Sequence, residues 1–151
     1  MKGASLTYKW LGIVLLFIGS YSFAQSPKFI QTMEFVKVKN DKHREATYFY
    51  ENNWKVFRDI ALENGFIQSY QLLTISADSI ADFDFLLITA YSDSLQLKQS
   101  EERFQKIIKE VRPNGPRLLN GLKPNDFRQN LYSKEAKILF SAWTDKKSLK
   151  R

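Results

Sequence analysis

The feature that most constrains the fold is the order in which two hydrophobic periodicities alternate along the chain. Residues 32–39 alternate two sets of side chains, as a strand with two different faces requires. Residues 41–64 instead repeat apolar side chains every three or four positions, as one face of an amphipathic helix does. These positions are Ala46, Phe49, Tyr50, Trp54, Phe57, Ile60 and Ala61. A strand followed by a long helix is therefore predicted, with Asn40 and Asp41 capping the helix and Asn64-Gly65 ending it.

Two further strands are predicted at residues 66–75 and 83–91, which are rich in aromatic and β-branched side chains. The polar segment 76–82 between them suits a hairpin connection. Apolar side chains occupy both faces of the segment 83–91, which indicates burial on both sides. One face is predicted to hold Phe83, Phe85, Leu87 and Tyr91, and the other Leu86, Ile88 and Ala90.

The last part of the chain predicts a second helix and a fourth strand. Asp93 or Ser94 caps a helix that runs to about residue 111. The segment 112–130 holds three of the four prolines and reads as a long connection. A final strand is expected at residues 136–143.

The resulting order, β-α-β-β-α-β, predicts an α+β domain of ferredoxin-like type. Such a domain has a four-stranded antiparallel sheet with two helices on one face. No helix covers the other face of the sheet, here called the bare face. Its side chains on the middle strands are still apolar, so a single copy of the domain would expose an apolar patch to solvent. Pairing of two copies sheet to sheet, as a homodimer, is the simplest way to cover it.

The N-terminus predicts export. Lys2 and Lys9 precede a short apolar run from Trp10 to Ile18, which is the layout of a secretory signal peptide. Small residues place the cleavage site after Ala24, in a periplasmic or extracellular protein. The alternative is an uncleaved membrane anchor, but the run is about half the roughly 20 residues that a spanning helix needs. The expected organisation is 1–24 signal peptide, 25–31 lead-in, 32–143 ferredoxin-like domain and 144–151 basic tail.

The amino-acid composition excludes several kinds of functional site and partner. The chain has no cysteine, which excludes disulfides, thiolate metal sites and cysteine nucleophiles, so stability must come from burial. Removing the signal peptide leaves 21 basic and 16 acidic side chains, a net charge of +5. The basic residues are scattered over the C-terminal half without a recognition motif, so no nucleic-acid partner is expected. No metal or cofactor is expected either, because Asp78, Asp82 and Asp84 match no metal loop and favour turn chemistry.

Four segments resemble the dimeric α/β-barrel family, and in particular a bacterial branch of it without an assigned activity. They are residues 35–39, 53–59, 64–70 and 83–94, and the resemblance covers about residues 32–143. This resemblance implies a dimer of two ferredoxin-like subunits whose sheets pack against each other. The family includes cofactor-free monooxygenases, haem-binding and haem-degrading enzymes, and members of no known activity, so the fold does not choose a function. The axial histidine of the haem-degrading members lies on the second helix, and this chain has none there.

An aromatic constellation is the best candidate for a binding site. Tyr50, Asn53, Trp54 and Phe57 on the first helix are expected to face Tyr70 and Tyr91 on the strands. In a family that binds flat organic molecules, this lining would suit a small hydrophobic or aromatic ligand, with Asn53 and Tyr70 orienting it and Arg58 offering charge. The alternative is that these side chains are core. His43, the only histidine, reads as a solvated surface residue.

Three functions follow from this sequence. The first is an exported ligand-binding or interaction domain. The second is a cofactor-free oxygenase or isomerase that acts on a hydrophobic organic substrate, although no catalytic residue can be named. The third is a structural protein of the cell envelope.

Overall fold

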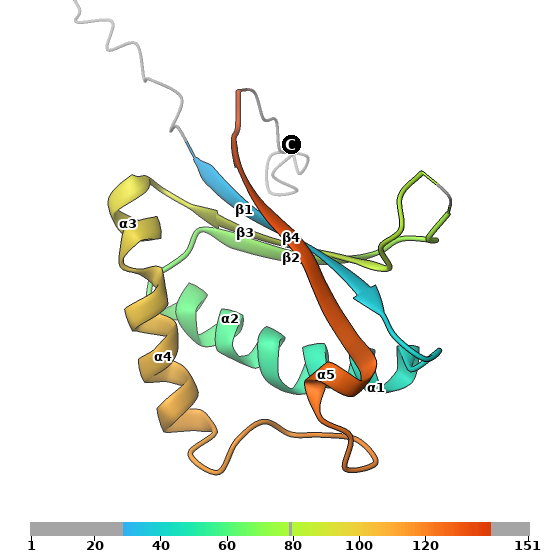
Figure 1. Ribbon diagram of the computed structural model, residues 1–151. Coiled ribbons are helices and arrows are strands. Elements are labelled where there is room, and N and C mark those ends of the chain that lie inside the picture. The colour runs from blue at the N-terminus through green and yellow to red at the C-terminus, as the bar shows by residue number, and fades with distance from the viewer. Residues whose placement is uncertain (1–28, 79, 140–151) are drawn as a thin grey trace, which may run out of the picture.

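The computed structural model describes residues 29–78 and 80–139, which form an α+β fold with four strands (Figure 1). The strands are β1 (Ile30–Val38), β2 (Ser69–Thr74), β3 (Phe85–Tyr91) and β4 (Arg128–Lys137). They form one sheet in the order β2-β3-β1-β4, and every neighbouring pair is antiparallel. This confirms the predicted antiparallel four-stranded sheet.

Helices cover one face of this sheet (Figure 1). The first helical segment consists of α1 (His43–Phe49), a π-helical turn η1 (Tyr50–Trp54) and α2 (Lys55–Glu63). The second consists of α3 (Ser94–Lys98) and α4 (Ser100–Val111), and α4 lies beside α2. A short helix α5 (Pro124–Phe127) leads into β4.

The local signals that end and start the helices act largely as expected. Gly65 takes φ +66°, and the Phe66 N–H donates to the Ala61 carbonyl at 2.8 Å, which closes the C-terminus of α2. The Asp93 carboxylate accepts from the Gln96 N–H at 2.8 Å and caps α3. The predicted cap at Asn40 and Asp41 is wrong. Both residues have φ of 54° and form the turn after β1, and no side chain caps α1.

Two hydrophobic clusters fill the space between helices and sheet. The first contains Val36, Val38, Ala46, Tyr50, Trp54, Phe85, Leu87 and Phe127. The second contains Phe57, Ala61, Ile67, Tyr91, Phe104 and Ile107. The side chains that the first helix was predicted to turn inward are therefore divided between two neighbouring parts of one core.

The fourth strand begins earlier than the predicted span of 136–143. It begins at Arg128, so the last part of the expected connection 112–130, residues 124–130, is α5 and strand. The reason is that β4 is an edge strand with mostly exposed side chains, so it needs no apolar pattern. The apolar run from Ile138 onward suggested the strand instead, and residues 140–143 lie outside the described part of the chain.

The two faces of β3 separate as predicted, except at Phe83. Phe85, Leu87 and Tyr91 face the helices and are buried. Phe83 precedes the strand, and its ring contacts Phe35 on the bare face, with ring centroids 4.9 Å apart. Because Phe83 lies in the loop before β3, strand alternation does not determine its direction.

Candidate functional site

The six side chains predicted to form a site come from two helical and two strand segments. Tyr50, Asn53 and Trp54 lie in η1, Arg58 in α2, Tyr70 in β2 and Tyr91 in β3. A π-helical turn holds more residues than an α-helical one, and such turns are frequent at functional sites. Tyr50, Asn53 and Trp54 are all buried, so η1 directs both of the adjacent residues Asn53 and Trp54 inward.

Asn53 is fully engaged in holding the chain together. Its Nδ2 donates to the carbonyls of Phe49 and Arg117 at 2.9 and 2.8 Å. Its Oδ1 accepts from the Arg117 N–H at 2.7 Å. The side chain therefore pairs with Arg117 as a neighbouring strand would, and ties the segment after α4 to the first helix. The structure thus uses Asn53 as a clamp, and these bonds occupy both N–H groups of the amide and one acceptor position of its oxygen.

Tyr50 and Tyr91 lie in different clusters of the core. Tyr50 is 1% exposed, its ring contacts Phe85, and its hydroxyl lies 3.5 Å from Arg128 Nη1. Burial raises the pKa of Tyr50, and the positive charge of Arg128 offsets part of that rise. Tyr91 is 3% exposed and packs with Phe57 and Phe104.

Trp54 and Tyr70 meet edge to face, with ring centroids 5.4 Å apart. The Tyr70 hydroxyl donates to the Asp59 carboxylate, which also accepts from Lys55 Nζ at 2.7 Å. Burial and this hydrogen bond raise the pKa of Tyr70. Burial alone would raise the pKa of Asp59, but the bonds from Lys55 and Tyr70 outweigh it and lower that pKa. The Tyr70 hydroxyl is thus already in use, whereas Trp54 Nε1 is buried without a hydrogen-bond partner.

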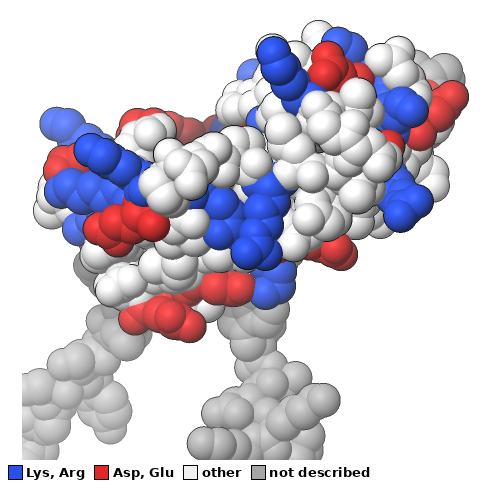
Figure 2. All heavy atoms as spheres, turned by 90° about the horizontal axis from the view of Figure 1, so that it is seen from below, with Lys and Arg blue, Asp and Glu red and all other residues white. Residues whose placement is uncertain are grey.

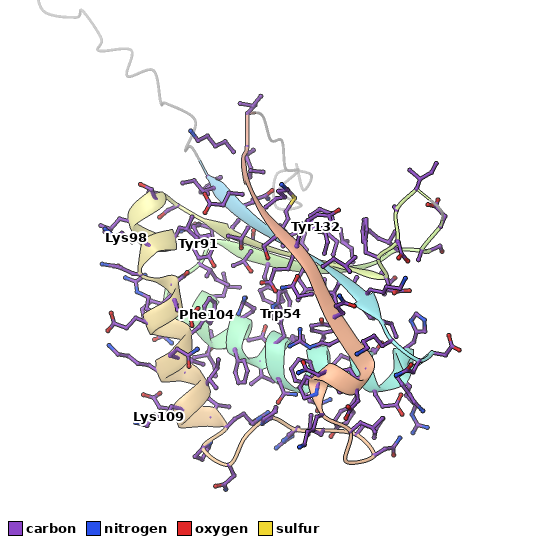
Figure 3. All side chains as sticks on the ribbon, in the orientation of Figure 1. Trp54, Tyr91, Lys98, Phe104, Lys109 and Tyr132 are labelled. Atoms are coloured by element: carbon purple, nitrogen blue, oxygen red, sulfur yellow. The ribbon has the colours of Figure 1, made fainter. Side chains whose placement is uncertain are left out.

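Arg58 is a second predicted site residue, besides Trp54, with hydrogen-bonding capacity left. Its guanidinium carbon lies 3.8 Å from the Phe104 ring centroid and 4.9 Å from that of Trp54. Its Nε donates to Thr89 Oγ1 at 3.1 Å, and the described residues offer it no ion pair. Burial lowers the pKa of Arg58, while Tyr91, Glu34 and Glu101 act to raise it. The residue stays charged at neutral pH, because the pKa of an arginine ordinarily lies far above neutrality. Figure 3 shows Trp54, Tyr91 and Phe104 in the layer between sheet and helices.

Polar side chains continue the helix-facing surface of the sheet beside Arg58. Thr89 pairs with Thr32, and Thr32 pairs with Glu135 across β1 and β4. The next row along β1 places Glu34 beside Ser133. Glu135 and Ser133 are exposed although they face the helix side, so this part of the sheet is open to solvent.

Sequence reasoning missed Thr89, Phe104 and Glu34 as neighbours of Arg58. Two signals point to them. Thr89 is the one aliphatic hydroxyl in the otherwise apolar and aromatic strand β3, and Glu34 interrupts a face that continues with Val36 and Val38. Phe104 lies within the predicted second helix, and its helical spacing alone does not identify it as a neighbour of Arg58.

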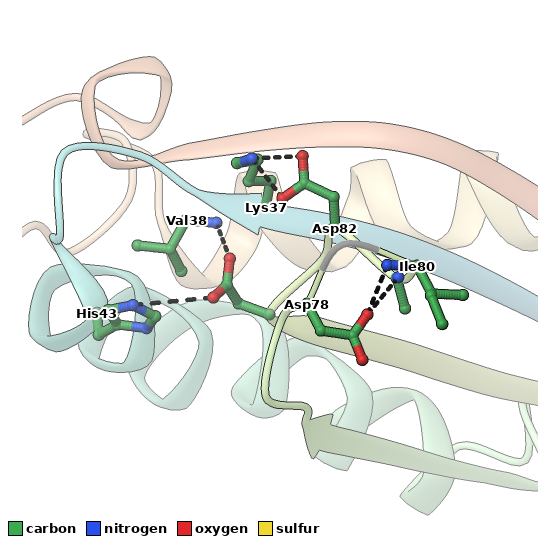
Figure 4. A network of polar contacts seen from close by, with 8 residues as sticks. Lys37, Val38, His43, Asp78, Ile80 and Asp82 are labelled. Carbon is green, nitrogen blue, oxygen red and sulfur yellow. Dashed lines mark hydrogen bonds and ion pairs between the residues drawn. The ribbon is translucent and has the colours of Figure 1, made fainter.

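His43 and the aspartates form a separate polar network at the end of β1 (Figure 4). His43 Nε2 lies 3.8 Å from Asp84 Oδ1, and its side chain is 58% exposed, which agrees with a surface role. Asp84 Oδ2 accepts from the Val38 N–H at 2.7 Å, and Asp82 pairs with Lys37. Asp78 accepts from two N–H groups of its own turn, as predicted. Within residues 29–78 and 80–139, no three His, Asp or Glu side chains gather as a metal site requires.

Basic and acidic side chains are interspersed on the face of the molecule that the helices form. Figure 2 views the molecule from below, on the helix side, and shows Lys and Arg side chains in the middle of this face, with Asp and Glu around them. Among the described residues, no helix has the length and apolar character needed to cross a bilayer.

Comparison with known proteins yields structural likenesses alone. No family model matches the chain, and no curated protein matches it in sequence. HapK from Hahella chejuensis is similar with a TM-score of 0.48 and 8% identity, over 77% of this chain and 98% of that one. NE2512, a protein of unknown function from Nitrosomonas europaea, is similar with a TM-score of 0.37 and 11% identity, over 78% and 95%. At these values neither likeness assigns a family or a function.

Because Asn53 holds Arg117 by paired hydrogen bonds, its substitution is predicted to destabilise the protein. Replacing Asn53 by Ala removes the paired bonds to Arg117, so we expect the free energy of unfolding to fall by about 1–2 kcal/mol. Urea denaturation measures this loss, and hydrogen exchange of the Arg117 amide should accelerate at the same time. Asn52→Ala is the control, because the Asn52 side chain bonds only to Tyr48 within the same helix, at 2.9 Å. Equal losses in the two variants would contradict the clamp.

Proposed function

We propose that this chain is an exported, homodimeric protein that binds a small planar organic anion at Arg58. The observation that carries the binding proposal is the state of the Arg58 guanidinium. It lies over two aromatic rings and has no carboxylate partner in the described structure. A partly buried cation without a counter-ion is costly, and a bound anion would remove that cost.

The neighbours of Arg58 favour a particular class of ligand. Trp54 and Phe104 provide apolar ring surface, and the indole N–H of Trp54 lacks an acceptor. Glu34 and Thr32, on the adjacent strand, supply an acceptor and a hydroxyl for polar groups of the ligand. A flat molecule with a carboxylate, phenolate or enolate oxygen beside a hydroxyl group would use all of these features.

Binding of 1-hydroxy-2-naphthoate tests this site. We expect Arg58→Gln to weaken binding by at least about 10-fold, because a charge-assisted hydrogen bond contributes about 1.5–3 kcal/mol. The neutral amide of the same probe should bind weakly to both proteins, with little difference between them. Isothermal titration calorimetry gives the affinities, and thermal unfolding shows whether each variant is folded.

Arg103→Gln is the matched control. Arg103 also lies over an aromatic ring, Phe66, with its guanidinium carbon 4.6 Å from the ring centroid, but it is on α4 and bonds to Gln99. Its loss should leave naphthoate binding unchanged. Equal affinity of wild type and Arg58→Gln for the naphthoate, or no binding by the wild type, would refute the Arg58 site.

The proposed assembly is a pair of ferredoxin-like domains joined through their sheets, as in the dimeric α/β-barrel family. The strand order β2-β3-β1-β4 and the helices on one face support the ferredoxin-like assignment. The short helix α5 and the two-part second helix are departures from the simple βαββαβ order.

An apolar row supports pairing through the bare face. Register places Leu73 opposite Leu86, Leu86 opposite Phe35, and Phe35 opposite Tyr132, so the row crosses all four strands. The Phe35 and Tyr132 rings stack with centroids 4.5 Å apart, and Leu73 and Tyr132 are 41% and 47% exposed. Figure 3 shows Tyr132 on the side of the sheet away from the helices. A continuous exposed row of this kind is typical of a protein interface.

Leu73→Lys should weaken the dimer by at least about 10-fold, because it places an unpaired charge in the apolar row. Sedimentation velocity over a range of concentrations measures this change. Leu62→Lys is the control, since Leu62 is 42% exposed but lies on α2. A wild-type chain that stays monomeric at every concentration would refute the dimer.

Export rests on the N-terminal sequence, which lies outside the described residues. We expect the protein recovered from its own cell envelope to begin at Gln25, with a homodimer mass and retained ligand mass in native mass spectrometry. A chain that still begins with Met1 would contradict cleavage after Ala24.

A further inference from the structure

A hollow of about 450 Å³ lies at the junction of α5 and β4, away from the Arg58 site. It is lined by Lys39, Asn125, Arg128, Gln129 and Asn130. Arg128 pairs with Val38, whereas Thr89, the partner of Arg58, pairs with Thr32. Val38 and Thr32 are separated by about 20 Å along an extended strand, so the two places are distinct.

The lining is polar and carries positive charge without a compensating acid. Lys39 and Arg128 are its two charged residues, and neither forms an ion pair within the described structure. Asp126 is the nearest acidic residue in sequence, and one oxygen of its carboxylate accepts from the Lys123 N–H at 2.8 Å, outside the lining of the hollow. A concave surface with two cations and no acid attracts anions.

Arg128 is held in place by aromatic rings. Its guanidinium carbon lies 4.8 Å from the Phe49 ring centroid and 5.7 Å from that of Tyr50. Its Nε is buried and has no hydrogen-bond partner, and its contact with the Tyr50 hydroxyl, at 3.5 Å, is at the outer limit for a hydrogen bond. A fixed guanidinium with unused donors binds carboxylate or phosphate oxygens in two-point fashion without losing much side-chain freedom.

Three amide side chains complete the hollow. Asn125, Gln129 and Asn130 are exposed and offer both donors and acceptors, which is what hydroxyl groups need. Lys39 is positioned by a hydrogen bond of 2.8 Å from its Nζ to the Asn125 carbonyl. β4 is an edge strand, so one row of its backbone polar groups also faces away from β1.

From these observations we infer a second binding site, for a small hydroxylated anion: a polyol that carries one phosphate or carboxylate group. The anionic group binds Arg128 and Lys39, and the hydroxyls bind the three amides. The volume suits a molecule of the size of a monosaccharide derivative.

Calorimetric titration of the full chain with four probes tests this site. Glucose 6-phosphate and gluconate represent the two sources of negative charge, and inorganic phosphate and glucose separate the anionic from the polyol contribution. We expect one of the first two to bind at least about 10-fold more tightly than phosphate or glucose alone. The tighter of the two identifies the anionic group. Absence of binding by both at millimolar concentration overturns the proposal.

Substitutions then locate the binding. Arg128→Gln should reduce affinity at least about 10-fold, and Arg128→Lys should lose less because it keeps the charge. Gln129→Ala and Asn130→Ala alter exposed side chains and should weaken binding several-fold in folded protein. Arg103→Gln and Arg58→Gln should leave it unchanged, whereas Arg128→Gln should leave naphthoate binding unchanged. If the Arg128, Gln129 and Asn130 variants all bind the probe as tightly as the wild type, the assignment of the site to this hollow is overturned.

A spectroscopic readout makes the test independent of stability. The Nε–H resonance of Arg128, assigned in ¹⁵N-labelled protein by its absence from Arg128→Lys, should move on binding. If the probe binds and this resonance stays fixed, the site is elsewhere.

Discussion

The structure depends on the π-helical turn η1, because successive residues of this turn and the following α2 hold three separate parts of the chain. Asn53 clamps the segment that leads to α5 and β4. Trp54 packs against Tyr70 of β2, and Arg58 reaches Thr89 of β3. In a regular α-helix, the adjacent residues 53 and 54 would point about 100° apart. The wider turn brings both into the core, so the same local distortion supports the fold and aims Arg58.

Two arginines then define the chemistry of the helix side. Each lies over aromatic rings and neither has a carboxylate partner in the described residues. Aromatic faces stabilise a cation by about 0.5–2 kcal/mol and leave its N–H donors unoccupied. The fold thus keeps both guanidinium groups in defined positions, while the donors other than Arg58 Nε and Arg128 Nη1 have no partner among the described side chains. This contrasts with Lys55 and Lys37, whose charges are already neutralised by Asp59 and Asp82.

The sequence predicted the elements whose patterns come from burial on one or two faces. The first helix and β3 are examples, because their apolar positions repeat with the period of the element. It failed for β4, where an edge strand has mostly exposed side chains and therefore carries no such period. The role of Asn53 and Tyr70 as ligand-orienting groups stays a prediction, and the sequence did not indicate that their polar atoms bond to Arg117 and Asp59. These partners are distant in sequence, and nothing in the local pattern identifies them. Arg58 was named for its charge, but its pairing with Thr89 and Phe104 depends on how α2, α4 and β3 pack together.

The division of the sheet into two unlike faces separates the surface proposed for assembly from the surfaces proposed for binding. The row through Leu73, Leu86, Phe35 and Tyr132 occupies the bare face. Arg58 lies on the helix side, and the hollow with Arg128 lies at the β4 edge. Strand alternation forces this separation, since neighbouring residues of a strand point to opposite faces. A partner that covers the bare face would therefore leave the Arg58 side of the sheet accessible, so that association and ligand binding draw on different residues of the same four strands.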